Sequence, residues 1–126
     1  MDRYPGDDCV DIVAFDYYDD YNTYPAEYSG EFVDNLKKTC QVVKNIADAK
    51  GKVAAISETG VRVMKADGSD NEGILVKGNP IAGHNWYKQV NQVAVDTGMP
   101  YFLLWANFGD TNFYVHINMM IPTDRN

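Results

Sequence analysis

The chain has 126 residues, of which 45% are hydrophobic and 13% aromatic, and its formal net charge at pH 7 is −7. This composition is typical of one folded globular domain and excludes a disordered, collagen-like or coiled-coil chain. Excess carboxylates repel phosphate backbones and anionic bilayers, so we expect neither nucleic acid nor a membrane surface as partner. The first residues lack the pattern of a signal peptide, and no apolar run has the length of a membrane span.

Three short apolar runs predict β-strands, at residues 10–15, 53–57 and 101–105. Each run is too short for a typical helix. The runs mostly lack strict alternation of apolar and polar residues, which is typical of parallel strands that are buried on both faces.

Two amphipathic helices are predicted between these strands, at about residues 30–50 and 86–97. Each has a capping residue before it and a glycine after it, namely Ser29 and Gly51 for the first helix and Asn85 and Gly98 for the second. The apolar positions predicted to face inward are Phe32, Leu36, Cys40, Val43 and Ala47, followed by Trp86, Val90, Val93 and Ala94. The order of elements predicts an α/β fold with a parallel sheet.

The strand-to-helix connections are long, and they lie beyond the carboxyl ends of the strands. Open α/β sheets and (β/α) barrels both place their functional sites at that edge. We therefore searched the strand ends for residues that could carry chemistry.

Glu58 is the most suggestive of these residues, because it directly follows a buried apolar strand and precedes Thr59 and Gly60. The alternative is a structural carboxylate that is hydrogen-bonded to a neighbouring loop. Asp16 and Tyr18 lie at the same level of the first strand, two residues apart, so they face the same way. Trp105 ends the third strand.

These side chains together suit a neutral sugar, whose C–H faces stack on aromatic rings while its hydroxyl groups bond to polar side chains. Each also has an ordinary structural interpretation: Tyr18 could pack in the core, and Trp105 could fill the mouth of a barrel.

No other motif predicts a metal or a cofactor. The acidic segment 67–73 lacks the glycine and the glutamate that a calcium loop requires, so we interpret it as a solvated turn. His84 and His116 lack partners for a metal site, Ser57 is not in a nucleophile-elbow motif, and no glycine-rich phosphate loop is present.

Four segments together resemble glycoside hydrolase family 26, the β-mannanases. They are YPGD with VDIVAFDYY in residues 4–18, KGKVAAISETG in residues 50–60, WY at residues 86–87 and YFLLWAN in residues 101–107. The resemblance covers roughly residues 4–115 in the family's order and spacing.

The resemblance implies a (β/α)8 TIM barrel, of which this chain would be the C-terminal portion, strands six to eight. Glu58 would be the nucleophile, and Tyr18 would orient it. Asp16, Trp105 and Asn107 would bind substrate, with Trp105 as the platform under the sugar. The implied reaction is retaining hydrolysis of β-1,4-mannosidic bonds in mannan, galactomannan or glucomannan, so the implied enzyme is a mannan endo-1,4-β-mannosidase.

The same resemblance implies that residues 1–126 form a single, truncated catalytic domain, since three strands cannot close a barrel. The family's acid/base glutamate would lie upstream, so we expect the isolated chain to be inactive and to require the N-terminal barrel half. Family resemblance also implies an extracellular location. The alternatives are a non-catalytic carbohydrate-binding fragment, a related glycanase acting on mixed-linkage glucan or xylan, and an unrelated flavodoxin-like domain in which Glu58 is structural.

Overall fold

The computed structural model describes residues 4–21, 29–64, 71–72, 85–105, 107–108 and 111–112. In chain order these residues form η1 (Asp7–Cys9), β1 (Ile12–Tyr21), α1 (Glu31–Ala49), β2 (Val53–Met64), β3 (Asn71–Glu72), α2 (Trp86–Thr97), β4 (Phe102–Leu104), β5 (Asn107–Phe108) and β6 (Thr111–Asn112). All five predicted elements are present, and β1 and β2 extend well beyond their predicted ends. No helix in these ranges combines the length and the apolar character that crossing a membrane requires.

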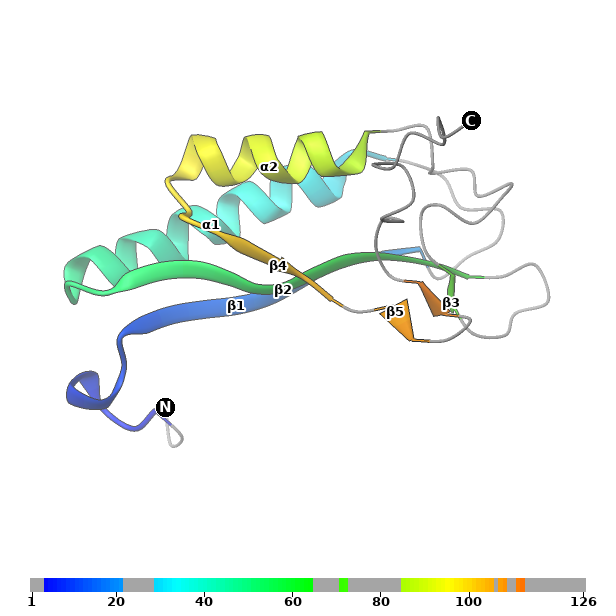
Figure 1. The fold of residues 1–126 in the computed structure, drawn as a ribbon. Coiled ribbons are helices and arrows are strands. Elements are labelled where there is room, and N and C mark those ends of the chain that lie inside the picture. The colour runs from blue at the N-terminus through cyan, green and yellow to red at the C-terminus, as the bar shows by residue number, and fades with distance from the viewer. Residues whose placement is uncertain are drawn as a thin grey trace, which may run out of the picture.

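A parallel sheet lies at the centre of the fold, with β2 between β1 and β4 (Figure 1). Both neighbours run parallel to β2, which confirms the predicted α/β order with its parallel sheet. The short β3 pairs antiparallel with the far end of β2, and β5 and β6 form a separate antiparallel pair. The sequence patterns did not predict these three short strands.

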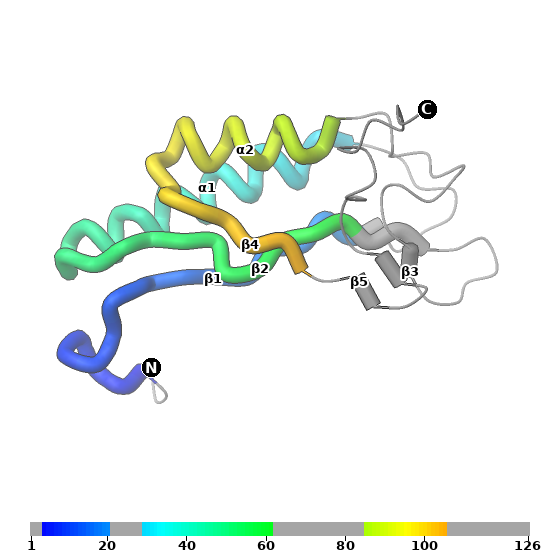
Figure 2. The backbone as a smooth tube through the Cα atoms, in the orientation of Figure 1, coloured from blue at the N-terminus to red at the C-terminus, as the bar shows by residue number. Residues whose placement is uncertain are grey.

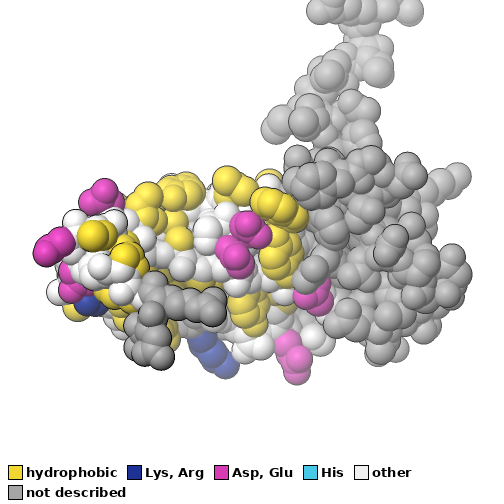
Figure 3. Space-filling model, turned by 90° about the horizontal axis from the view of Figure 1, so that it is seen from below, with side chains coloured by type: hydrophobic (Ala, Val, Ile, Leu, Met, Phe, Trp, Pro, Cys, Tyr) yellow, Lys and Arg dark blue, Asp and Glu magenta, His cyan; other side chains and the backbone are white. Residues whose placement is uncertain are grey.

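Both helices cover the same face of the sheet, and among the described residues no helix lies over the other face (Figure 1). The prediction that these strands are buried on both faces is therefore wrong. On the uncovered face, Ile12 is 44% exposed, Val53 46% and Leu103 49%. We call this surface the open face, and Figure 3 views the molecule from that side, where hydrophobic side chains lie between acidic ones.

The hydrophobic core lies between the helices and the sheet. Helix α1 contributes Phe32, Leu36, Cys40 and Ala47, helix α2 contributes Trp86, Val90, Val93 and Ala94, and β2 contributes Ala54, Ile56 and Val61. Val43 is partly buried and packs against this cluster. The helix faces predicted from the apolar spacing are thus confirmed.

The helix ends agree with the predictions at three of four positions. Gly51 and Gly98 have left-handed backbones, with φ of 62° and 70°, and Asn85 is the N-cap of α2, although its side chain makes no capping hydrogen bond. Ser29 is not the N-cap of α1, because Gly30 holds that position with a φ of 78°. The Ser29 hydroxyl oxygen instead accepts a hydrogen bond from the backbone N–H of Glu31 at 3.3 Å.

A polar cluster attaches the segment before β1 to the end of α1. The Lys50 ammonium donates hydrogen bonds to the Asp7 carboxylate at 2.7 and 2.8 Å, and the Tyr4 hydroxyl donates to the same carboxylate at 2.6 Å. These hydrogen bonds lower the pKa of Asp7, and the bond from Lys50 has a larger effect than the bond from Tyr4. The Asp7 carboxylate in turn raises the pKa values of Lys50 and Tyr4.

We expect Asp7→Asn to lower the melting temperature slightly at neutral pH, because exposed ion pairs stabilise weakly. Since the folded state lowers the pKa of Asp7, this contribution is present above the ordinary pKa of an aspartate and is lost as pH falls through the lowered value. The difference in melting temperature between Asp7→Asn and the parent chain should therefore vanish in acid. Thermal melts across the acid range measure it, with the exposed neighbour Asp8→Asn as control.

Candidate functional site

Strand β2 contains one more residue than either neighbour at the level of Ser57. Between β1 and β2 the register passes from Phe15 opposite Ile56 to Asp16 opposite Glu58, so one step on β1 corresponds to two on β2. The pairing with β4 shows the same extra residue, with two steps from Phe102 to Leu104 against three from Ile56 to Thr59. This arrangement is a β-bulge in a parallel sheet, and the backbone tube bends in the middle of β2 (Figure 2).

The bulge places Ser57 and Glu58 on the same face. In a regular strand, side chains alternate, so Glu58 would point with Ala54 and Ile56 into the helix-covered core. Beyond the bulge, Thr59 and Val61 are fully buried, which shows that the alternation resumes with the opposite parity. Glu58 consequently belongs to the open face, as a site residue requires.

Glu58 contacts Tyr18 directly. The Tyr18 hydroxyl donates a hydrogen bond to Glu58 Oε2 at 2.8 Å across the β1–β2 pair, in a half-buried position. The predicted proximity of these two residues is therefore confirmed. Glu58 lies within β2 and not at its end, because pairing with β1 and β3 continues the strand to Met64.

Asp16 also lies on the open face, as its spacing from Tyr18 predicts. Its Oδ1 accepts a hydrogen bond of 2.7 Å from the Ser57 hydroxyl. Sequence reasoning considered Ser57 only for a nucleophile elbow and overlooked this role. A hydroxyl residue directly before a strand-borne glutamate was the available signal.

Trp105 directly follows β4 and is 37% exposed. Its backbone N–H donates a hydrogen bond of 2.8 Å to the Thr59 carbonyl oxygen, so the Trp105 backbone lies beside the residue that follows Glu58. The backbone of Asn107 pairs with Asn112 in the β5–β6 hairpin. The side chain of Asn107 lies outside the described residues, as do His84, His116 and, in the segment 67–73, all residues but two. Those two, Asn71 and Glu72, form β3 and pair with β2, so the interpretation of the whole segment as a solvated turn is wrong for them.

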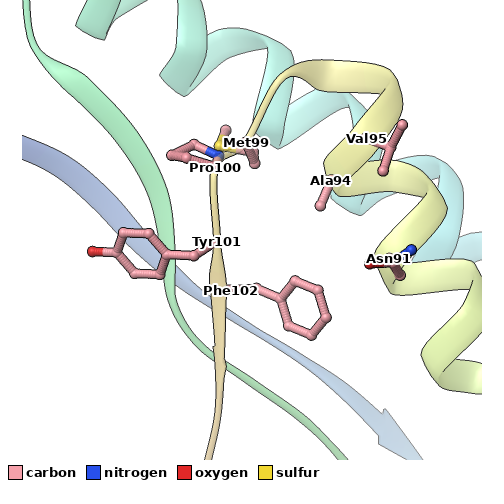
Figure 4. Close-up of a pocket in the computed structure, with 7 residues that line it drawn as sticks. All are labelled: Asn91, Ala94, Val95, Met99, Pro100, Tyr101 and Phe102. Carbon is pink, nitrogen blue, oxygen red and sulfur yellow. The ribbon is translucent and has the colours of Figure 1, made fainter.

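A hollow of about 330 Å³ lies away from this carboxylate, between α2 and the start of β4 (Figure 4). Its lining is mainly apolar and consists of Asn91, Ala94, Val95, Met99, Pro100, Tyr101 and Phe102. The hollow has no carboxylate in its lining and contains none of the predicted site residues. Across the part of the chain that the structure describes, no group of three or more metal-ligating side chains occurs either.

The arrangement on the open face can hold and orient a carboxylate. Tyr18 fixes one oxygen of Glu58, and hydrogen bonds to an ionised acceptor are stronger than those between neutral groups. The side chain is only half-buried, so its other oxygen can approach a molecule on the open face. Such a carboxylate can serve as a nucleophile or as a hydrogen-bond acceptor for a sugar hydroxyl.

Several relatives show what this chain is similar to. It is 25% identical over 111 residues to a mannan endo-1,4-beta-mannosidase of Bifidobacterium adolescentis. This match covers 84% of this chain and 10% of that protein. The catalytic domain of the Bacillus sp. JAMB-750 endo-beta-1,4-mannanase matches it with a TM-score of 0.64 and 29% identity, over 94% of this chain and 29% of that one.

A modular endo-beta-1,4-mannanase from Cellulomonas fimi matches with a TM-score of 0.63 and 30% identity, over 90% of this chain and 22% of that one. The chain thus spans less than a third of each of these relatives. The structural neighbours are TIM-barrel proteins. The sequence profile of glycosyl hydrolase family 26 matches residues 1–93, and the chain therefore belongs to this family.

Proposed function

We propose that this chain supplies the nucleophile-bearing part, strands six to eight, of a retaining endo-β-1,4-mannanase, and that Glu58 is the nucleophile. The observation that carries the proposal is the 2.8 Å hydrogen bond between the Tyr18 hydroxyl and Glu58 on the open face. The mannanases to which the chain is similar support β-mannan as the substrate class.

In the proposed reaction, a Glu58 oxygen attacks the anomeric carbon as the bond to the glycosidic oxygen breaks. A second carboxyl group, about 5–5.5 Å from the first in retaining enzymes, protonates the departing oxygen. The resulting glycosyl ester is then hydrolysed by water, which loses its proton to that second group and restores Glu58. The Tyr18 hydroxyl orients Glu58 throughout.

The second carboxyl group comes from outside this chain in our proposal. The open face carries exposed apolar side chains, and Val95 in the lining of the hollow is 67% exposed. These are surfaces that the other strands and helices of a barrel would cover, because closing a barrel leaves no sheet edge. The remaining barrel strands are thus the partner of this chain, and Asp16, Trp105 and Asn107 bind the sugar beside Glu58.

The test is a chimera of the Bacillus sp. JAMB-750 catalytic domain in which the aligned segment is replaced by residues 1–126. We expect the chimera to hydrolyse galactomannan, while the isolated chain does not, since acid/base assistance is worth roughly 10²–10⁴-fold. A folded chimera that binds mannooligosaccharides in calorimetry without cleaving them would point instead to a non-catalytic binding role. Preference for mixed-linkage glucan or xylan would contradict the proposed substrate.

Replacing Tyr18 by phenylalanine tests how Glu58 is oriented. We expect kcat of the chimera to fall about ten- to a hundredfold, because a hydrogen bond to a charged group is worth about 1.5–3 kcal/mol. The steady-state rate on galactomannan measures this. Tyr101→Phe is the matched control, because Tyr101 is an exposed phenol outside the proposed site.

A further inference from the structure

We propose that Ser57 is a positioning residue, and that its hydrogen bond to Asp16 holds the β2 bulge in the form that turns Glu58 toward Tyr18. The meaning of this hydrogen bond for catalysis rests on the proposed function.

The direction of Glu58 depends on where the extra residue of β2 lies. Ser57 is the residue that both neighbouring strands lack, since the register with β1 and the register with β4 each shift across it. If β2 ran through Ser57 as a regular strand without the bulge, the side-chain alternation would send position 58 into the core beside Ala54 and Ile56. The direction of Glu58 therefore depends on the bulge.

The Ser57–Asp16 hydrogen bond lies at the bulge itself. It joins the bulged residue to the residue on β1 that lies opposite Glu58 in the register. A bulge interrupts the regular ladder of backbone hydrogen bonds, so a side-chain bond at this point can replace lost cross-strand attachment. The acceptor is a carboxylate, and the distance is 2.7 Å, which is short for a hydroxyl donor.

Two side-chain hydrogen bonds connect β1 and β2 side by side. Ser57 bonds to Asp16, and the next residue, Glu58, bonds to Tyr18, two positions further along β1. Consecutive residues of β2 thus bond to side chains on the same face of β1. Removal of the first connection frees the bulge to relax and leaves the second without its alignment.

The test uses the 126-residue chain with ¹³C-labelled tyrosine, and it follows the Cζ resonance of Tyr18, which reports hydrogen bonding of the phenol to a carboxylate. Tyr18→Phe assigns the resonance. We expect Ser57→Ala to shift it toward the value of a solvated phenol and Ser57→Thr to restore it. Asp16→Leu breaks the same bond from β1 at an exposed position and should reproduce the shift. Ser29→Ala, a hydroxyl at the start of α1, is the control.

An unchanged Tyr18 resonance in folded Ser57→Ala or Asp16→Leu would overturn the proposal. Unfolding of either variant in a thermal melt would also count against it, because the bond would then support the whole fold and not the direction of Glu58. In the chimera, Ser57→Ala should lower kcat about tenfold with little change in KM, as expected for a misdirected nucleophile. An inactive parent chimera would refute the proposed function but leave the spectroscopic result on Ser57 standing.

Discussion

Replacing Glu58 by alanine should abolish mannan hydrolysis by the completed barrel, with a loss on the order of 10⁴–10⁶-fold in kcat. The Tyr18 hydroxyl orients the Glu58 carboxylate, and without this nucleophile the covalent intermediate does not form. Reducing-sugar release from galactomannan measures the loss. Glu31→Gln, an exposed carboxylate at the start of α1, should leave the rate unchanged.

The Glu58→Ala variant also allows a positive test of the role of Glu58. A small external anion such as azide can occupy the space left by the carboxylate and attack the anomeric carbon of an activated β-mannoside. The product would be the α-mannosyl azide, because a single displacement inverts configuration. Recovery of rate with that product identifies the nucleophile. A Glu58→Ala chimera that retains most of its parent's activity would refute the assignment.

Replacing Trp86 by alanine should have the largest effect on stability. Trp86 is 1% exposed. Its ring stacks on that of Phe32, with 5.9 Å between the ring centroids, and meets the Tyr87 ring edge-on, with 5.5 Å between the centroids. Truncation of a buried aromatic side chain costs about 3–5 kcal/mol, which is a large share of the 5–15 kcal/mol typical of a whole domain. Urea denaturation followed by circular dichroism gives the change in the free energy of unfolding.

Trp86→Phe should lower the free energy of unfolding by less than half as much as Trp86→Ala. The phenylalanine ring keeps most of the apolar contact with Phe32, and the substitution removes an indole N–H that has no hydrogen-bond partner among the described residues. Equal losses for the alanine and phenylalanine variants would show that the size of the ring, and not its burial as such, determines stability here.

The main architecture of this fold could be predicted from the sequence because apolar spacing directly reflects which side of an element is buried. The four inward positions of α2 are all buried, and glycine ends both helices. The contact between Tyr18 and Glu58 followed from the family resemblance, which implied that Tyr18 orients the nucleophile.

The bulge could not be predicted, because one extra residue leaves no mark on the composition of β2. The lengths of β1 and β2 were underestimated for a related reason. Asp16, Asp19 and Asp20 are unusual strand residues, yet backbone pairing with β2 keeps them in extended backbone. The strands carry apolar residues on the open face as well, as strands that are buried on both faces do. Residue type alone therefore predicted burial there.

The bulge also determines how β2 would respond to a change in chain length. Its two segments are out of phase, with Ala54 and Ile56 buried before Ser57 and Thr59 and Val61 buried after it. Deletion of Ser57 would join them into one regular alternation, in which Glu58 stays opposite Asp16 on the open face and Val61 stays in the core. Deletion of Gly60 would instead turn Val61 out of the core, so an in-frame deletion should be tolerated at Ser57 far better than at Gly60.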